Sequence, residues 1–198
     1  MLLGNVSDLR LLGTVEYLSG CNRLALPLEH GDIDVIRSMN KRLKLERVLT
    51  AAKYVDRLGI PCNIFIIYGY PGETKERFKN SLQFYLKIKK AAPSVEFECF
   101  IIQPYPGTKL LARCISEGWL AADIFSTVDK IDQFSTKDVV WIETADFDRE
   151  EVLRRGRILH KKLSSKAKIL RRKILSYAPD NVADWLRTIY HIIRKLRR

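Results

Sequence analysis

The stretch Pro61–Thr74, PCNIFIIYGYPGET, decides how the rest of this 198-residue chain is interpreted. It begins with an unbroken apolar run, Ile64–Ile67, which is typical of a strand that is buried on both faces. In the turn that follows, Pro71 fixes φ and Gly72 adopts a positive φ at little cost. Thr74 is suited to cap a long helix that begins after it. The stretch therefore predicts a strand, a tight turn and a helix, with the turn at the strand end where α/β folds bind ligands.

Two similar strand-turn-helix units flank this stretch. Asn22–Leu28 is a short apolar strand that ends in Glu29–Asp32 and is followed by two helical patterns. Val95–Ile102 is a strand that ends in Gln103–Thr108, and a helix over Lys109–Glu117 follows it. Crossovers of this length imply neighbouring parallel strands joined in the right-handed sense.

These units place the chain in the α/β class, and a helix expected over residues 7–20 precedes them. A three-stranded parallel sheet has two open edges, and both of its faces need cover. The sheet is therefore either a small αβ layer or a part of a larger barrel. Residues 118–147 are the least regular, and their strand-like segment Val139–Ile142 predicts an edge strand, a lid or a packing segment.

Composition excludes several classes of protein. Hydrophobic residues make up 46% of the chain, which argues against disorder. No apolar run approaches the roughly 18 residues that span a bilayer. The four cysteines form no CxxC pair and are expected to be buried thiols rather than disulfides. Together these features predict a cytoplasmic protein.

The charge is concentrated in one part of the chain. Residues 149–198 contain 16 Lys and Arg against four acids, whereas residues 1–148 carry 19 charges of each sign. This shift predicts a domain over residues 1–147 and a basic helical tail over residues 148–198, in which Pro179 separates two amphipathic helices. Such helices can bind an anionic membrane surface, which would make the protein peripheral at the membrane, or nucleic acid. They can equally be a helical cover with a solvated basic face, and without cover the open sheet is expected to self-associate.

Three motifs resemble a known family. Ala25–Lys41 (ALPLEHGDIDVIRSMNK), Phe65–Thr74 (FIIYGYPGET) and Gln103–Thr108 (QPYPGT) occur in the order and spacing of the second half of a radical S-adenosylmethionine (SAM) enzyme barrel. The resemblance covers roughly residues 7–120 and is nearest to the methylthiotransferases and the cobalamin-dependent radical SAM proteins. It implies a partial TIM-type (β/α) barrel, strands four to six, followed by the basic C-terminal helices.

The resemblance also implies chemistry and partners. Enzymes of this family cleave SAM reductively at a [4Fe-4S] cluster to form a 5′-deoxyadenosyl radical, and some also use cobalamin. The cluster needs three cysteines in a CxxxCxxC loop, and the four cysteines here do not have that spacing. We therefore expect the C-terminal part of such an enzyme, which is inactive until it meets a cluster-bearing N-terminal half encoded by the same gene or by a separate chain. The alternative is a non-catalytic αβ module that binds nucleic acid or an anionic membrane through its basic helices.

The resemblance implies cofactor-binding residues at the three strand ends. Glu29 would face the ribose or methionine part of SAM, because a carboxylate accepts hydrogen bonds from hydroxyl or ammonium groups. The alternative for Glu29 is a turn residue that caps the next helix. His30 stands where the family often has Ser, which weakens any role carried over to it.

The remaining candidates would offer apolar contacts and backbone groups to adenine; they are Ile67, Gly69, Gln103 and Tyr105. Core packing and turn formation are the alternative for these four. Glu73 is interpreted as a residue of the helix start rather than a catalytic acid. The sequence assigns no catalytic residue and no metal ligand.

Overall fold

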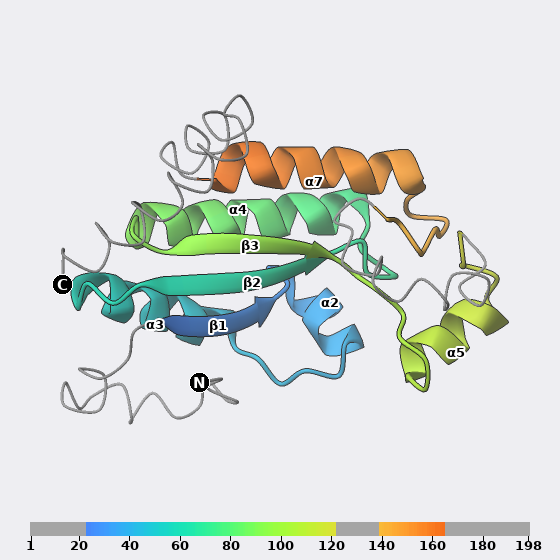
Figure 1. Ribbon diagram of the computed structural model, residues 1–198, viewed down its shortest axis with the longest axis horizontal. Helices are drawn as coiled ribbons and strands as arrows, with labels where there is room; N and C mark the ends of the chain where they lie inside the picture. Colours follow the sequence, from blue (N-terminus) through green and yellow to red (C-terminus); the bar gives the residue numbers. More distant parts are fainter. Residues whose placement is uncertain (1–22, 122–138, 165–198) are drawn as a thin grey trace, which may run out of the picture. The chain divides into compact units, whose positions relative to one another are not determined.

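The computed structural model describes residues 23–121 and 139–164 (Figure 1). The expected helix over residues 7–20, the second basic helix and the middle of the irregular segment lie outside these ranges. The chain divides into two compact units, Met1–Leu163 and Ser164–Arg198. The first unit contains the described strands and helices.

A parallel sheet of three strands forms the centre of the first unit. Its strands are β1 (Leu24–Glu29), β2 (Cys62–Tyr68) and β3 (Glu96–Ile101), in the spatial order β1-β2-β3. Both pairs are parallel, as the crossover lengths predicted. The register of β1 on β2 shifts between Pro27 and Glu29, which places a bulge at the carboxyl end of β1.

The described residues form five helices. They are α2 (Ile33–Ser38), α3 (Leu45–Arg57), α4 (Lys75–Ala91), α5 (Lys109–Ser116) and α7 (Arg149–Leu163). Side chains cap three of them. Thr74 caps α4, as predicted, Thr108 caps α5, and α2 is capped by Asp32 rather than by Glu29. Each cap satisfies backbone N–H groups in the first turn that have no partner within the helix.

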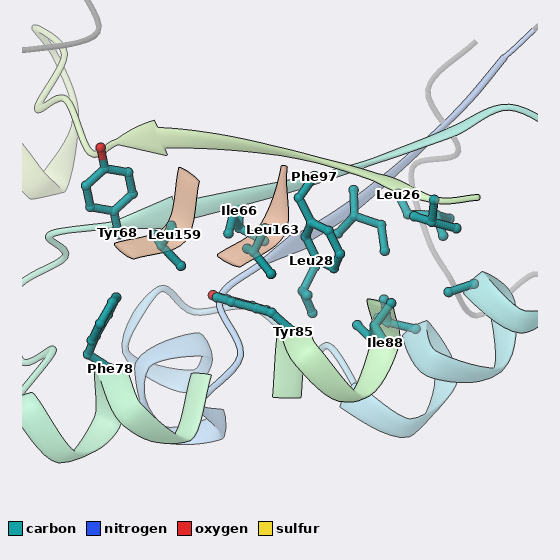
Figure 2. Close-up of a cluster of buried hydrophobic side chains, with 14 of the residues drawn as sticks. Leu26, Leu28, Ile66, Tyr68, Phe78, Tyr85, Ile88, Phe97, Leu159 and Leu163 are labelled. Carbon is teal, nitrogen blue, oxygen red and sulfur yellow. The ribbon is translucent and has the colours of Figure 1, made fainter. Parts of the chain in front are cut away.

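Three of these helices pack on one face of the sheet (Figures 1 and 2). α4 lies between α3 and α7, and the alternate strand residues that point toward this layer are buried; they include Leu24, Leu26, Leu28, Ile64, Ile66, Tyr68 and Phe97. The other face carries Phe65 and Ile67, which are only partly buried. The prediction that β2 is buried on both faces is therefore wrong for the described residues, because their helices cover a single face.

Helix α7 belongs with the sheet rather than with a separate tail. It packs against β3, β2 and α4, and the compact unit ends at Leu163, well beyond the change in charge near residue 148. Gly156 brings α7 close to the sheet, because a Cβ atom there would lie 2.5 Å from the hydroxyl of Tyr68. The charge boundary is thus not a boundary of packing.

The strand-like segment Val139–Ile142 makes no ladder with the sheet. Its only described pairing is an isolated antiparallel bridge from Ile142 to Leu120. Val140, Trp141 and Ile142 are buried in the core cluster. Of the three alternatives for this segment, the structure supports the packing segment.

Candidate functional site

The site is built at the carboxyl edge of the sheet, where the turn after β1 begins with Glu29. This residue adopts a left-handed conformation with φ of 64°, directly after the bulge. Its side chain is 14% exposed and forms an ion pair with Lys41, which follows α2. One carboxylate oxygen is used in this pair, so the other remains available to accept hydrogen bonds.

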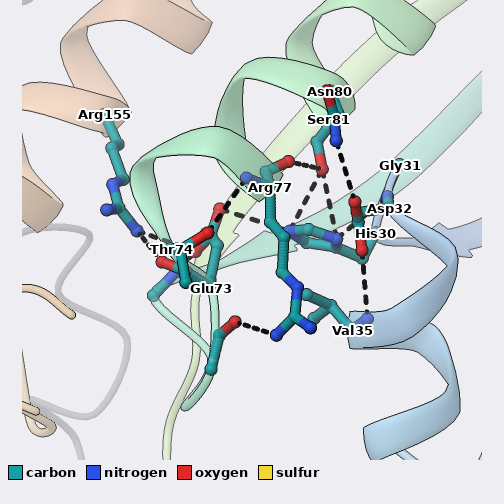
Figure 3. Close-up of polar contacts among 12 residues, drawn as sticks. His30, Gly31, Asp32, Val35, Glu73, Thr74, Arg77, Asn80, Ser81 and Arg155 are labelled. Atoms are coloured by element: carbon teal, nitrogen blue, oxygen red, sulfur yellow. Dashed lines mark hydrogen bonds and ion pairs between the residues drawn. The ribbon is translucent and has the colours of Figure 1, made fainter.

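His30 comes next and is fully buried. Its Nδ1 accepts a hydrogen bond from the backbone N–H of Asp32 at 3.1 Å, so the proton of the ring lies on Nε2. Nε2 then donates to Oε1 of Glu73 at 3.2 Å. The hydroxyl of Ser81 lies 3.2 Å from Nδ1 and itself donates to the carbonyl of Arg77 (Figure 3). Both ring nitrogens thus form hydrogen bonds within the protein, and the side chain of His30 is buried beneath the carboxyl edge of the sheet.

Glu73 is the centre of a buried polar network. It is fully buried and joins His30 to the turn after β2, because its Oε2 accepts a hydrogen bond from the N–H of Gly69 at 2.5 Å. Oε2 also lies 3.5 Å from Nη1 of Arg155 on α7. A carboxylate is buried at acceptable cost only when donors and a cation surround it in this way. Glu73 therefore does much more than begin α4.

Arg155 supplies the cation and is also fully buried. Its Nη1 donates to the carbonyl of Glu73 at 2.7 Å, and its Nε donates to Glu151 at 3.0 Å. The guanidinium carbon lies 5.3 Å from the ring centres of both Phe78 and Phe147. Its Nη2 has no hydrogen-bond partner among the described residues.

Helix α4 also forms hydrogen bonds with the turn after β1. The backbone N–H of Gly31 donates to the hydroxyl of Tyr85 at 2.9 Å, and Asn80 donates to Asp32 at 3.4 Å. Burial raises the pKa of Tyr85 well above its usual value, and the negative charge of Glu73 adds to this effect. Tyr85 is therefore neutral at ordinary pH and acts as a fixed hydrogen-bonding group.

The turn after β3 is built differently. The hydroxyl of Tyr105 donates to Gln103 at 2.8 Å, and Thr108 caps α5 by accepting from the N–H of Leu111. Tyr105 is 55% exposed. Both of these hydrogen bonds join residues that are close together in the sequence.

The face of the sheet opposite the helices carries apolar and polar groups in separate places. The rings of Phe65 and Phe100 meet edge to face with their centres 5.9 Å apart, and Ile67 follows Phe65 on the same side of β2. Nearer the amino ends of the strands, Asn63 donates to Glu98 and accepts from Arg23. The apolar part therefore lies at the same end of the strands as Glu29.

The residues predicted from sequence fall into two groups. Glu29 and Ile67 are partly exposed near the carboxyl edge, and Gln103 and Tyr105 lie on the third turn. His30 and Gly69 are buried, and their polar groups are bonded to other protein groups. The structure thus places the ring of His30 and the N–H of Gly69 inside the protein, and their predicted role in cofactor binding stays a prediction.

Sequence reasoning did not find Ser81, Tyr85 or Arg155, and it assigned Glu73 only to the helix start. Arg155 carried a signal, since it lies on the same helical stripe as Val152 and Leu159, three residues from one and four from the other. A charged residue in an apolar stripe predicts a buried ion pair.

The described cysteines do not suit an iron–sulfur cluster. Burial raises the pKa of the Cys62 thiol to about 12, with a small opposing effect of Arg23, so it is not a ready thiolate ligand. Within residues 23–121 and 139–164, no group of three or more His, Cys, Asp or Glu side chains could hold a metal ion. The partly exposed Glu29 and the apolar face beside it, by contrast, suit the hydroxyl and aromatic groups of a nucleoside.

Comparisons with known proteins agree with this arrangement. A sequence model of the Radical SAM superfamily matches residues 6–85. The tRNA-2-methylthio-N(6)-dimethylallyladenosine synthase of Malacoplasma penetrans is 36% identical over 67 residues, which are 32% of this chain and 13% of that protein. The ribosomal protein uS12 methylthiotransferase RimO of Chlorobium luteolum is 34% identical over 87 residues, 43% of this chain and 18% of that protein.

The fold has a counterpart among solved structures. Coproporphyrinogen III oxidase (HemN) from Escherichia coli, a radical SAM enzyme, superimposes with a TM-score of 0.51 at 17% identity, over 82% of this chain and 35% of that one. Residues 6–85 thus match the radical SAM superfamily in sequence, and the fold of the described residues is similar to that of a radical SAM enzyme. The expected likeness to methylthiotransferases is confirmed, and the matched segments span 13% and 18% of those two relatives. None of the described helices is long and apolar enough to cross a membrane.

Proposed function

We propose that this chain forms the adenosine-binding side of a radical SAM enzyme, as strands four to six of its barrel. The carrying observation is the carboxyl edge itself: an accessible carboxylate, Glu29, lies beside an apolar sheet face and is held by a buried network. In the complete enzyme, SAM bound to a [4Fe-4S] cluster would supply the hydrogen-abstracting chemistry. The site is part of a cytoplasmic enzyme in this proposal.

Each residue has a definite task in the proposal. Glu29 accepts hydrogen bonds from the ribose hydroxyls, with Lys41 balancing its charge. Ile67 and Phe65 provide apolar contact for adenine and exclude water from it. Gln103 and Tyr105, on the third turn, close over the ligand from the side of β3. His30 and Gly69 act indirectly, by holding the turns.

The proposal needs a partner for the cluster, because the described cysteines do not fit one. We propose that the three thiolates come from a cluster-bearing half outside these 198 residues, which would also cover the open sheet face and prevent self-association. The use of cobalamin by the complete enzyme is a separate proposal, which rests on the family resemblance and not on any particular residue of this chain. The binding of nucleic acid or an anionic membrane rests on the charge of residues 149–198 alone and stays a prediction.

Titration of the chain with 5′-deoxyadenosine, followed by two-dimensional NMR, tests the nucleoside site. We expect shifts of the backbone amides at residues 29, 67 and 103–105, and weaker binding by Glu29→Gln. Glu96→Gln is the matched control, because Glu96 begins β3 at the opposite end of the strands from this edge. Shifts that spread over the whole chain, or equal effects of the two variants, would refute the assignment of Glu29.

A further inference from the structure

One stripe of α7 lies against the carboxyl end of β2. Val152 lies beside Gly69, Gly156 lies against the hydroxyl of Tyr68, and Arg155 reaches Glu73. Figure 3 shows the guanidinium group of Arg155 directed at the turn that carries Thr74 and Glu73. His30 lies on the other side of the Glu73 carboxylate. Helix α7 therefore meets the site at the point where the strand becomes the turn.

The buried guanidinium is held at both ends. Glu151, one helical turn earlier, accepts from Nε and fixes the group to α7. Nη1 makes the hydrogen bond to the carbonyl of Glu73 and the ion pair with its carboxylate. The rings of Phe78 and Phe147 also contact the group, with each ring centre 5.3 Å from the guanidinium carbon. Such a group has few alternative positions, so it can define where its partner lies.

The partner is the carboxylate that joins two strand ends. Oε2 of Glu73 holds the N–H of Gly69 after β2, and Oε1 holds Nε2 of His30 after β1. His30 is the residue next to Glu29, whose main chain is in the left-handed conformation. Movement of the Glu73 carboxylate would therefore release both turns at once.

We propose that Arg155 is a positioning residue, which holds the carboxylate of Glu73 in the orientation that binds Gly69 and His30 together. By this contact α7 sets the place of Glu29 at the ligand edge, a consequence that rests on the proposed nucleoside site. Arg155 lies outside residues 6–85, the part that matches the superfamily. The site would therefore need a helix that the family match does not contain.

Amide hydrogen exchange of the 198-residue chain tests the proposal without any ligand. In Arg155→Ala we expect the exchange of the Gly69 N–H to accelerate by about tenfold or more relative to amides in the centre of β2. The matched control is Leu159→Ala, which removes a fully buried side chain from α7 and leaves the guanidinium in place. This control should accelerate exchange throughout the sheet, with no preference for Gly69.

Chemical rescue separates positioning from packing. Arg155→Ala removes a fully buried guanidinium that contacts two aromatic rings, so millimolar guanidinium should occupy the space and restore slow exchange of the Gly69 N–H. Sodium chloride at equal ionic strength should not restore it, and Leu159→Ala should not respond to either salt. In the proposed nucleoside titration, the affinity of Arg155→Ala should fall and recover in parallel with the amide.

Two results would overturn the proposal. The first is an exchange rate of the Gly69 N–H that does not change in Arg155→Ala, or that sodium chloride restores as well as guanidinium does. The other concerns the wild-type protein, which remains informative even if Arg155→Ala does not fold: long-range ¹H–¹⁵N spectra should show the His30 proton on Nε2, and a proton on Nδ1 would contradict the network. Absence of nucleoside binding would count against the proposed function and leave these two measurements decisive for Arg155.

Discussion

The turns after β2 and β3 are alike in sequence and different in structure. Both contain Tyr-Pro-Gly, in both the glycine has a positive φ (88° at Gly72 and 78° at Gly107), and both lead to a threonine that caps the next helix. The turn after β2 has one additional residue, Glu73, between the glycine and the threonine. That residue is fully buried, whereas Tyr105 of the other turn is 55% exposed.

The additional residue, Glu73, connects parts of the molecule that are far apart in the sequence. It connects the turn after β2 to the turn after β1 through His30 and to α7 through Arg155. In the turn after β3, the hydroxyl of Tyr105 donates to Gln103, and Thr108 caps α5 by accepting from Leu111. The turns after β1 and β2 are therefore joined by buried hydrogen bonds, and the turn after β3 carries an exposed tyrosine.

The largest expected effect comes from removing the inserted carboxylate. Glu73→Leu should lower the free energy of unfolding by about 3–5 kcal/mol, because it breaks a buried ion pair with Arg155 and leaves the N–H of Gly69 and Nε2–H of His30 without an acceptor. Tyr105→Ala, in the matching turn, should change this free energy by less than about 0.5 kcal/mol. Urea denaturation followed by circular dichroism measures both, and equal effects would show that the two turns do not differ as described.

The two turn glycines should behave alike. Gly72→Ala and Gly107→Ala should each destabilise the chain by about 1–2 kcal/mol, because a left-handed conformation is costly for a residue with a Cβ atom. Neither Cβ would meet a close neighbour. A Cβ at position 72 would lie 3.6 Å from the nearest other atom, a guanidinium nitrogen of Arg77, and a Cβ at position 107 would face open space. Asn tolerates this φ, so Gly107→Asn should recover most of the loss in thermal unfolding. A cost that persists in Gly107→Asn would contradict the conformational explanation.

The two threonine caps test how far each helix is coupled to the sheet. Each side chain accepts from a backbone N–H at 3.2 Å, in α4 from Arg77 and in α5 from Leu111. Replacement by Ala costs about 1 kcal/mol at such a cap. Thr74→Ala should lower the stability of the whole unit, because α4 lies in the middle of the helix layer, between α3 and α7. Thr108→Ala should instead accelerate hydrogen exchange within α5, and a global loss of equal size would show that α5 is coupled as tightly as α4.

The smallest effect concerns pH and the acid that anchors Arg155. Hydrogen bonds from Arg154, opposed by burial and reinforced by Arg155, lower the pKa of Glu151 from 4.5 to about 2. A lowered pKa means that the carboxylate stabilises the folded state above pH 4.5 and that this contribution is lost as the pH falls toward 2. Because Arg154 is half-exposed, the contribution is about 1 kcal/mol. Denaturation at several pH values should show a flatter profile over this range for Glu151→Gln than for the wild type, and parallel profiles would contradict this role.

The local elements could be predicted from the sequence. The apolar runs, the two Tyr-Pro-Gly turns and the cap at Thr74 predicted three parallel strands and the helices that follow them, because turn and cap chemistry acts over a few residues. The cofactor candidates Glu29 and Ile67 came from the resemblance to the family, and their role stays a prediction. The three motifs also carried the resemblance to the radical SAM superfamily, which the comparisons support.

Only the tertiary structure decided which residues support the edge. Glu73 looked like an ordinary helix-start acid and Arg155 like one of many charges in a basic tail, since sequence spacing does not say which charges lose their water. Folding brings them within 3.5 Å although 82 positions separate them along the chain. Burial then makes the pairing obligatory, because an ion removed from water is stable only beside a counter-charge and donors. The sequence by itself determined the strands and their turns, and the packing of α7 on the sheet determined how those turns are held.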